Sequence, residues 1–405
     1  MRVLLSTIGS RGDVEPILAL AIQLKALDQQ VRVCAPPDFQ EWIEAFAIPA
    51  IPIGPMLRPL TATSAPILSS RPSFEVMQKL VSASVATQFD TITEAARGCD
   101  VLLAGGALQV AARSVTQLLG SRYVYASYCP GTLPSAHHAP PPIRPGDRER
   151  AQTMDNETLW AQDAKRFNET FGAALNSHRT AAGLPPVADV RTYIYGDQPW
   201  LAADATLAPW PVPADPDVIQ TGAWIRRDDR TLPTELENFL DAGEPAVYLG
   251  LGSMRAPVGL SQAMIEAARS VGRRAILSRG WADLALIDDR PDIIAIGEVN
   301  QQLLFRRVAA VVHHGGAGTT TAAARAGAPQ VIIPQNYDQY YWAGRVQELG
   351  IGVAHPNGSP TSETISACLT QALKPAVARQ AKSIARSIRS DGANVAARRL
   401  VHGAS

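Results

Sequence analysis

RVAAVVHHGGAGTTTAAARAGAPQVIIP, residues 307–334, decides the fold of this 405-residue chain. The stretch begins with a short apolar run over residues 308–312 and ends with a second one over residues 331–334. A glycine-rich turn and an alanine- and threonine-rich segment of helical length lie between them. We therefore predict a buried strand, a turn, a helix and a second buried strand, the repeating unit of a parallel sheet covered by helices.

The turn in this stretch suits an anion. His314 closes the strand, Gly316 and Gly318 let a ligand approach the backbone closely, and Thr319 stands where the N–H groups of a first helical turn are free. A helix N-terminus favours negative charge, and an imidazole N–H is a donor that a packed turn does not need. We interpret the turn as a cradle for the phosphates of a nucleotide, with a tight turn that binds nothing as the alternative. It matches neither of the common phosphate-loop patterns, because no Gly-Lys-Ser/Thr follows and the glycines are not spaced as GxGxxG.

The alternation of strand and helix continues on both sides of this stretch. In the N-terminal half, residues 3–6, 13–27 and 31–35 have the patterns of strand, helix and strand. A second alternating series begins at residue 247, after the proline-rich segment 207–218. The fold class is therefore α/β, with two Rossmann-like, doubly wound domains that face each other across a cleft.

The domain limits follow from the same pattern. We expect an N-terminal domain over residues 1–206, a linker over 207–218 and a C-terminal, nucleotide-binding domain over 219–376. We expect the final helices, within residues 377–405, to cross back to the N-terminal domain. The proline-rich loop 129–150 follows a predicted strand and should shape the cleft, since ligands of doubly wound sheets collect at the carboxyl ends of strands.

Composition argues against several classes of protein. Lys and Arg together number 37, as do Asp and Glu, so the charge favours neither nucleic acid nor an anionic membrane as a partner. No apolar run approaches the length of a membrane span, and the chain begins directly with a strand pattern, so we expect a cytoplasmic protein without integral membrane contact. The cysteines form no CxxC pair and should be reduced core residues: Cys34, Cys99, Cys129 and Cys368.

The first strand leads into a second glycine turn, which contains Ser10 and Asp13. Because this turn lies at the carboxyl end of a strand, Asp13 should face the cleft opposite His314. A carboxylate in that place can act as a general base. On local grounds, a carboxylate that caps the following helix is an equally good interpretation.

Two strand ends of the C-terminal domain carry groups suited to a nucleotide. Gly252 and Ser253 follow one strand and could add backbone donors to a pyrophosphate. Arg279 and Trp281 follow another, where a flat cation and an indole could stack on a base. The alternative for Trp281 is a structural position at the edge of the domain.

Asp338 and Gln339 follow the strand at 331–334. A carboxylate beside an amide suits hydrogen bonding to the vicinal hydroxyls of a hexose, although the pair could merely cap a helix. We find no plausible carboxylate cluster for a metal ion. A leaving diphosphate would then be stabilised by His314, glycine N–H groups and the helix dipole.

Together these motifs resemble those of the nucleotide-sugar-dependent glycosyltransferases of the GT-B fold, family 1. The similarity is greatest to the glycosyltransferases of glycopeptide antibiotics of the vancomycin and teicoplanin class. The stretches that carry it are MRVLLSTIGSRGDVEP at 1–16, LNSHRTAAGLPPV at 175–187, DQPWLAAD at 197–204, QTGAWI at 220–225, AILSRGWADL at 275–284, AIGEVNQQLLF at 295–305 and HHGGAGTTTAAARAGAPQ at 313–330.

The resemblance implies a role for each matching position. In the family, the Asp of GSRGD is the general base on the acceptor hydroxyl, which points to Asp13, with Ser10 nearby. The second His of HHGGAGT contacts the donor diphosphate, which points to His314, and the Asp-Gln pair recognises the hexose in glucose-using members, which points to Asp338 and Gln339. The other donor-binding positions are Gly252, Ser253, Arg279, Trp281, Val299, Gly316, Gly318 and Thr319.

The resemblance also implies the reaction, with the acceptor bound by the domain of residues 1–206 and the nucleotide sugar by that of residues 219–376. We expect an inverting, metal-independent glycosyltransferase, without a cofactor, that moves a hexose from a nucleotide sugar to a hydroxyl of a natural product. The Asp-Gln pair favours UDP-glucose as the donor, with a dTDP-sugar as the alternative. The expected acceptor is a hydrophobic or peptide aglycone of a glycopeptide antibiotic, and a sterol, lipid or macrolide is the alternative.

Two other functions and an expectation about assembly complete the sequence-based reading. A hydrolysing nucleotide-sugar epimerase would share the architecture but need further cleft carboxylates. A non-catalytic nucleotide-sugar-binding module would have no use for Asp13. We expect the protein to be a monomer.

Overall fold

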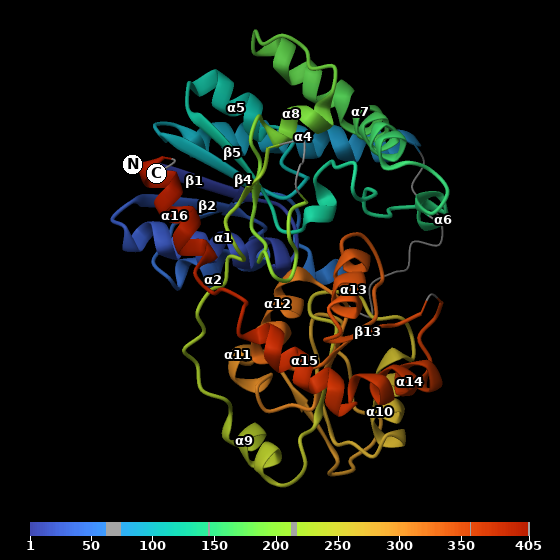
Figure 1. The fold of residues 1–405 in the computed structure, drawn as a ribbon. Helices are drawn as coiled ribbons and strands as arrows, with labels where there is room; N and C mark the ends of the chain where they lie inside the picture. Colours follow the sequence, from blue (N-terminus) through green and yellow to red (C-terminus); the bar gives the residue numbers. More distant parts are fainter. Residues whose placement is uncertain (62–73, 145, 212–216, 357, 404–405) are drawn as a thin grey trace.

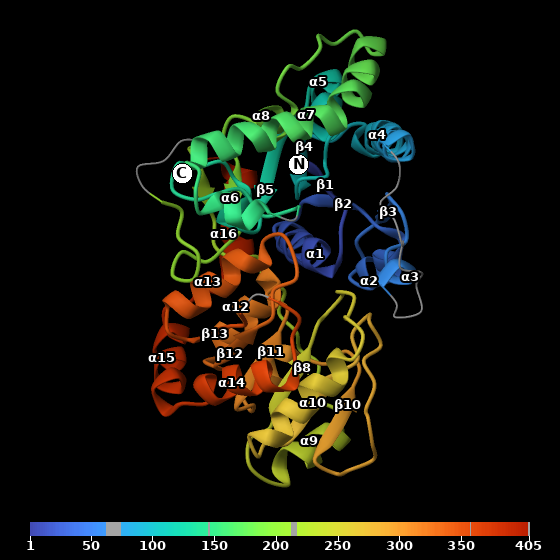
Figure 2. The same ribbon diagram turned by 90° about the vertical axis from the view of Figure 1, so that its right-hand side faces the viewer.

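The computed structural model describes residues 1–61, 74–144, 146–211, 217–356 and 358–403. Its strands form two parallel sheets, one of seven strands and one of six, in separate halves of the molecule (Figure 1). Helices pack on these sheets in both halves, as a turned view also shows (Figure 2). The predicted α/β fold with two Rossmann-like domains is therefore confirmed.

The first sheet has the strand order β3-β2-β1-β4-β5-β6-β7, with every pairing parallel. The strand order changes direction between β1 and β4, which is where such a sheet opens a crevice for a ligand. Its strands are β1 (Arg2–Thr7), β2 (Gln30–Ala35), β3 (Ala50–Pro52), β4 (Val101–Gly105), β5 (Arg122–Ser127), β6 (Trp200–Leu201) and β7 (Ile219–Gln220).

The second sheet has the order β10-β9-β8-β11-β12-β13, again entirely parallel. Here the change of direction lies between β8 and β11, so the histidine-glycine turn after β11 stands at the second crevice. Its strands are β8 (Val247–Gly250), β9 (Ala275–Ser278), β10 (Ile293–Ile296), β11 (Ala310–His313), β12 (Gln330–Ile332) and β13 (Gly352–Ala354).

The helices follow the strands along the chain. Those before β8 are α1 (Arg11–Ala26), α2 (Gln40–Glu44), α3 (Arg58–Thr61), α4 (Phe74–Ala96), α5 (Ala112–Leu119), α6 (Asp147–Ala151), α7 (Asn156–Ala181), α8 (Val190–Tyr195) and α9 (Thr234–Asp241), with short 3₁₀ turns at Pro37–Phe39 and Pro130–Thr132. Those after β8 are α10 (Leu260–Ser270), α11 (Gln301–Leu304), α12 (Ala317–Ala326), α13 (Gln339–Glu348), α14 (Ser362–Ala372), α15 (Pro375–Ala385) and α16 (Gly392–His402).

The passage between the domains lies later in the chain than we expected. The proline-rich segment 207–218, whose residues 212–216 lie outside the described ranges, connects β6 to β7 within the first sheet. Strand β7 was expected to open the second domain but pairs with β6. The chain therefore leaves the first sheet after Gln220 and crosses over residues 221–233.

Only part of the final helical region crosses back. Helix α15 stays on the second domain, where the Lys382 backbone packs against Gly327 at the end of α12. Helix α16 returns to the first domain and packs on α1 (Figure 1), and its Asn394 Nδ2 donates to Gln23 Oε1 at 3.1 Å. The start of α16 packs closely against the crossing at residues 221–233. A Cβ on Gly392 would lie only 2.4 Å from the carbonyl carbon of Gly222.

The cysteine prediction is confirmed, since all four cysteines are buried and free. None of the helices in the described ranges combines the length and the apolarity that crossing a membrane requires.

Leu400 tests how strongly α16 holds to the first domain, because its side chain is buried with the apolar residues of α1. We expect Leu400→Ala to lower the free energy of unfolding by about 2–5 kcal/mol, the usual cost of such a cavity. Urea denaturation would measure the loss. Arg398→Ala, on the exposed side of the same helix, is the control and should change stability little. Equal, small effects would show that α16 is not part of the first core.

Candidate active site

Asp13 is fixed by the turn between β1 and α1. The Ser10 backbone N–H donates to Asp13 Oδ2 at 2.8 Å, which forms a capping box at the start of α1. The helix-cap interpretation therefore holds for one carboxylate oxygen. The other, Oδ1, lies toward Gly106, where a Cβ would come within 3.5 Å of it. Gly9 must lack a side chain, since a Cβ there would lie 2.1 Å from Oδ2.

Asp338 lies close enough to Asp13 to change its titration. Burial and the negative charge of Asp338 raise the pKa of Asp13 to about 7. Burial likewise raises the pKa of Asp338 to about 6, although Trp342 Nε1 donates to its Oδ2 at 3.1 Å. The structure thus brings together two carboxylates from different domains, a pairing that the sequence analysis did not predict.

His314 stands beside two backbone turns. His313 pairs with Gly250 in the sheet, so the turns after β11 and β8 are neighbours. The His314 ring consequently lies between Gly252 and Gly316, where added Cβ atoms would approach it to 3.2 and 2.5 Å. Burial lowers the pKa of His314 to about 4, which keeps the ring neutral. Its Nδ1 is buried without a hydrogen-bond partner among the described residues.

The adjacent histidine has a different task. The Gly315 N–H donates to His313 Nδ1 at 3.1 Å, which assigns the ring proton to Nε2, 2.9 Å from Gln330 Oε1. His313 is thus satisfied inside the protein and fixes the turn. An unpartnered buried nitrogen on His314 beside a satisfied His313 points to a ligand for His314.

The N-terminus of α12 points its free N–H groups into the same place. Gly316 is the N-cap, and a Cβ on Gly318 would meet no atom of the described residues within 4 Å, so these residues leave the first turn open on that side. The Thr320 and Thr321 hydroxyls are turned back onto the carbonyls of Gly316 and Ala317. The first-turn N–H groups, including that of Thr319, have no partner within the helix and can bind an anion.

Other predicted donor residues are arranged less simply. Trp281 stacks on Phe39 of the first domain, with ring centroids 5.6 Å apart and planes 25° apart. This contact gives Trp281 a structural role at the edge of its domain, which was the alternative to stacking on a base. Gln339 accepts hydrogen bonds from the backbone N–H groups of Gln335 and Asn336 at 2.7 and 3.2 Å, so its side chain is engaged within its own loop.

The remaining predicted residues line strand ends of the second domain. The Arg279 side chain is exposed after β9, and Ser253 is partly buried after β8. Val299 follows β10 and packs against the apolar cluster around α11. Within the described residues, no group of three or more His, Cys, Asp or Glu side chains is arranged to hold a metal ion.

Sequence analysis missed Tyr128, whose hydroxyl donates to the Asp13 carbonyl at 3.1 Å. The tyrosine follows β5, and a polar aromatic residue directly after a parallel strand is the signal that could have found it. Its hydroxyl also excludes a side chain at Gly105, because a Cβ there would lie 2.3 Å away.

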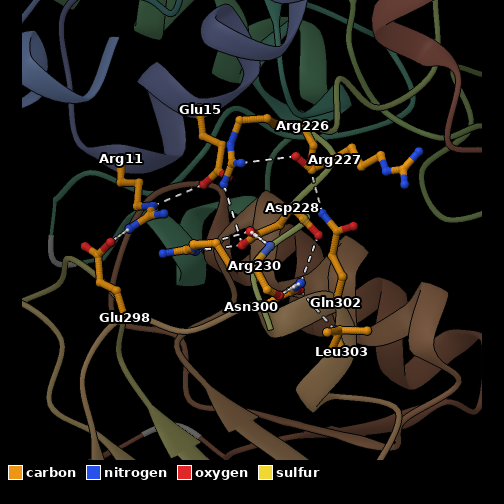
Figure 3. A network of polar contacts seen from close by, with 10 residues as sticks. All are labelled: Arg11, Glu15, Arg226, Arg227, Asp228, Arg230, Glu298, Asn300, Gln302 and Leu303. Carbon is orange, nitrogen blue, oxygen red and sulfur yellow. Dashed lines mark hydrogen bonds and ion pairs between the residues drawn. The ribbon is translucent and has the colours of Figure 1, made fainter. Parts of the chain in front are cut away.

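An ion-pair network joins the two domains (Figure 3). Arg11, two residues before Asp13, pairs with Glu15 at 3.1 Å and with Glu298 of the second domain at 2.7 Å. Glu15 also pairs with Arg226 of the crossing segment at 3.3 Å. The network therefore fixes three segments relative to one another: the turn between β1 and α1, the crossing at residues 221–233 and the segment after β10.

The crossing segment is held at further points in the same view (Figure 3). Asn300 Nδ2 donates to the carbonyls of Asp228 and Arg230, both at 2.8 Å. Gln302 Nε2 donates to the Arg226 carbonyl at 2.7 Å. The Arg226 guanidinium also lies 5.7 Å from the Trp42 ring centroid, which adds a cation–π contact.

Two Rossmann-like domains, each with a parallel sheet, form the architecture of the GT-B glycosyltransferases. The solved structure of the glycosyltransferase of kitacinnamycin shares this fold, with a TM-score of 0.73 and 19% identity over 99% of this chain and 98% of that one. At that identity the likeness shows the fold alone.

Sequence comparison gives the family. Residues 3–113 match the glycosyltransferase family 28 N-terminal domain, and residues 270–396 match the erythromycin biosynthesis protein CIII-like C-terminal domain. The chain is 52% identical to glycosyltransferase GtfE of Amycolatopsis orientalis over 98% of this chain and 96% of that one. It is 50% identical to the vancomycin aglycone glucosyltransferase of that organism over 100% and 98% of the two chains. The chain therefore belongs to the same glycosyltransferase family as these two relatives and is itself a glycosyltransferase.

Arg226 provides a test of the interdomain network. We expect Arg226→Ala to lower the free energy of unfolding by about 1–3 kcal/mol, because it removes a buried ion pair and aromatic contacts. Urea denaturation followed by tryptophan fluorescence would measure this. Arg227→Ala is the matched control, since the adjacent Arg227 side chain is 86% exposed and pairs only locally with Asp229. Similar losses in both variants would contradict the role of Arg226.

Asp338→Asn tests the electrostatic state of the cleft. The folded-state pKa of Asp338 is raised above 3.8, so the folded protein binds more protons than the unfolded chain between pH 4 and about 6. Stability from this group is therefore lost as pH rises through that range. At pH 8 we expect the neutral Asn to raise the melting temperature by about 2–4 °C, the shift that 1 kcal/mol gives in a domain of 150–250 residues. At pH 4 the variant should match the wild type.

The control for this experiment has the opposite sign. Hydrogen bonds from Arg269 lower the pKa of Asp288 to about 2, so its contribution to stability is present at neutral pH. Asp288→Asn should lower the melting temperature at pH 8. A lower melting temperature for Asp338→Asn at pH 8 would show that Asp338 is not electrostatically disfavoured.

Proposed function

We propose that this glycosyltransferase transfers glucose from UDP-glucose to a hydroxyl of a glycopeptide aglycone, with inversion at the anomeric carbon. The observation that supports the proposal is a pair of buried polar groups, one on each domain. Asp13 of the first domain lies close enough to Asp338 of the second for their charges to interact, and on the second domain His314 Nδ1 is buried without a partner among the described residues.

Asp13 is suited to be the base. With a pKa of about 7 it can accept a proton at neutral pH, and Ser10 holds one of its oxygens so that the other is free for the acceptor hydroxyl. As the hydroxyl oxygen attacks the anomeric carbon, its proton passes to Asp13 and the bond to the diphosphate breaks. Attack from the side opposite the leaving group inverts the configuration.

The second domain is suited to the departing diphosphate. Its negative charge would be met by the first-turn N–H groups of α12 and by the neutral ring of His314 donating a hydrogen bond. In this proposal no metal ion is needed. The nucleotide itself extends toward the ends of β8, β9 and β10, where Gly252, Ser253, Arg279, Trp281 and Val299 lie.

The sugar would lie between the two carboxylates. Asp338 Oδ1 can accept from a hexose hydroxyl, since Trp342 occupies Oδ2. Gln339 contacts the sugar only if its side chain leaves the backbone of Gln335 and Asn336. The glycopeptide acceptor is proposed because the vancomycin aglycone glucosyltransferase is a relative of half-identical sequence along the whole chain.

A mass-spectrometric transfer assay tests the proposal. The wild type should glucosylate a glycopeptide aglycone from UDP-glucose, and dTDP-glucose, a sterol and a macrolide are parallel arms. We expect Asp13→Asn to reduce kcat/KM by about 10²–10⁴, the usual contribution of a general base. The exposed Asp90→Asn should retain wild-type activity. Retention of configuration in the product, or full activity of Asp13→Asn, would refute the mechanism.

A further inference from the structure

Tyr337 has an unfavourable backbone conformation directly beside the reacting groups. Its φ is 53°, in the left-handed region, and it immediately precedes Asp338. Glycine or asparagine adopts this conformation readily, whereas an aromatic residue seldom does. Such a conformation persists only where the surrounding structure enforces it, and it is concentrated at functional sites.

The side chain of Tyr337 reaches the first domain. Arg191 of α8 lies close enough to the Tyr337 hydroxyl to favour its ionised form, which offsets part of the rise that burial causes in the pKa of Tyr337. Arg191 is itself 4% exposed and pairs through Nε with Asp163 of α7 at 2.9 Å. It also lies 4.8 Å from the ring centroid of Phe167 and 5.2 Å from that of Tyr195. Tyr337 therefore contacts a cation that is fixed on several sides.

The helix that follows Tyr337 is docked on the same domain. The Arg148 guanidinium of α6 lies 4.4 Å above the Tyr340 ring. A Cβ on Gly131 would come 3.2 Å from the Tyr341 ring, and Arg345 Nε donates to the Leu207 carbonyl at 3.0 Å. In the turned view α13 accordingly lies against the first domain, near α6 (Figure 2).

We propose that Tyr337 is a positioning residue: anchored on Arg191 of the first domain, it holds the turn before α13 in a left-handed conformation and so sets Asp338 opposite Asp13. The anchor lies in one domain and the carboxylate that it places lies in the other. This inference rests on the proposed function, because it assumes that Asp13 and Asp338 flank the reacting sugar.

The proposal distinguishes the role of the Tyr337 hydroxyl from that of the backbone conformation at this position. If the backbone conformation alone mattered, Tyr337→Asn would preserve the placement of Asp338, because asparagine accepts the left-handed region. If the hydroxyl on Arg191 matters, Tyr337→Phe should release the turn although the ring remains. Tyr341→Phe is the matched control, since it removes a neighbouring hydroxyl while it keeps the ring that packs on Gly131.

The experiment measures kcat and KM of the four proteins with UDP-glucose over pH 5–9, after UDP binding by calorimetry has shown that each is folded. We expect kcat of Tyr337→Phe and of Tyr337→Asn to fall about tenfold or more, because misplacement of reacting groups lowers the rate rather than binding. KM for UDP-glucose should stay within about twofold. The acidic limb of the pH profile should move to lower pH, since Asp338 no longer lies close to Asp13. Tyr341→Phe should match the wild type.

A crystal structure of Tyr337→Phe gives a readout that does not depend on turnover. We expect a changed backbone conformation at residue 337 and a larger separation between the carboxylates of Asp13 and Asp338. Wild-type kcat and pH profile in Tyr337→Phe, or wild-type kcat in Tyr337→Asn, would overturn the anchor. If the wild-type protein forms no product, the proposed function fails, and an unchanged turn in the Tyr337→Phe structure would overturn the anchor separately.

Discussion

All strands of a parallel sheet end at the same edge, and in this protein two such edges face each other. The turn after β1 therefore comes next to the segment after β10, where Arg11 pairs with Glu298 at 2.7 Å although the two residues are far apart in the sequence. The turns after β1 and β11 each stand where the strand order of the sheet changes direction, so neither is covered by a crossover helix. The position of the site is thus a consequence of sheet topology, and the side chains only determine what the site does.

The cleft shifts the pKa values of its titratable groups away from their usual values. A carboxylate in the first turn of a helix normally has a lowered pKa, yet burial and the charge of Asp338 raise the pKa of Asp13. Burial has the reverse effect on the imidazole of His314, whose pKa is lowered. The result is a carboxyl group that can hold a proton near neutral pH on one domain and an uncharged imidazole on the other. Both pKa shifts arise because burial disfavours the charged form of each group, and the proposed transfer reaction uses both.

Sequence reasoning succeeded where one strand and the following turn suffice. Asp13 and His314 each follow a strand at the point where the strand order of the sheet changes direction, as local pattern and a general rule of parallel sheets predict. Their opposition across the cleft stays a prediction. The domain crossing was misplaced because β6 and β7 have two residues each, too few to show a strand period between prolines. Trp281 on Phe39, Arg11 with Glu298 and Tyr337 on Arg191 are contacts between remote elements, and single-sequence patterns carry no information about such pairs.

The return of α16 means that the polypeptide passes between the domains twice. The chain leaves the first domain after β7 and returns to it before α16. The backbones of Gly222 and Gly392 are in contact where these two crossings pass each other. Both connections pass through one place, so the two domains are tethered there. Any change in the distance between the domains would be larger on the sides of the molecule that are farther from these two glycines.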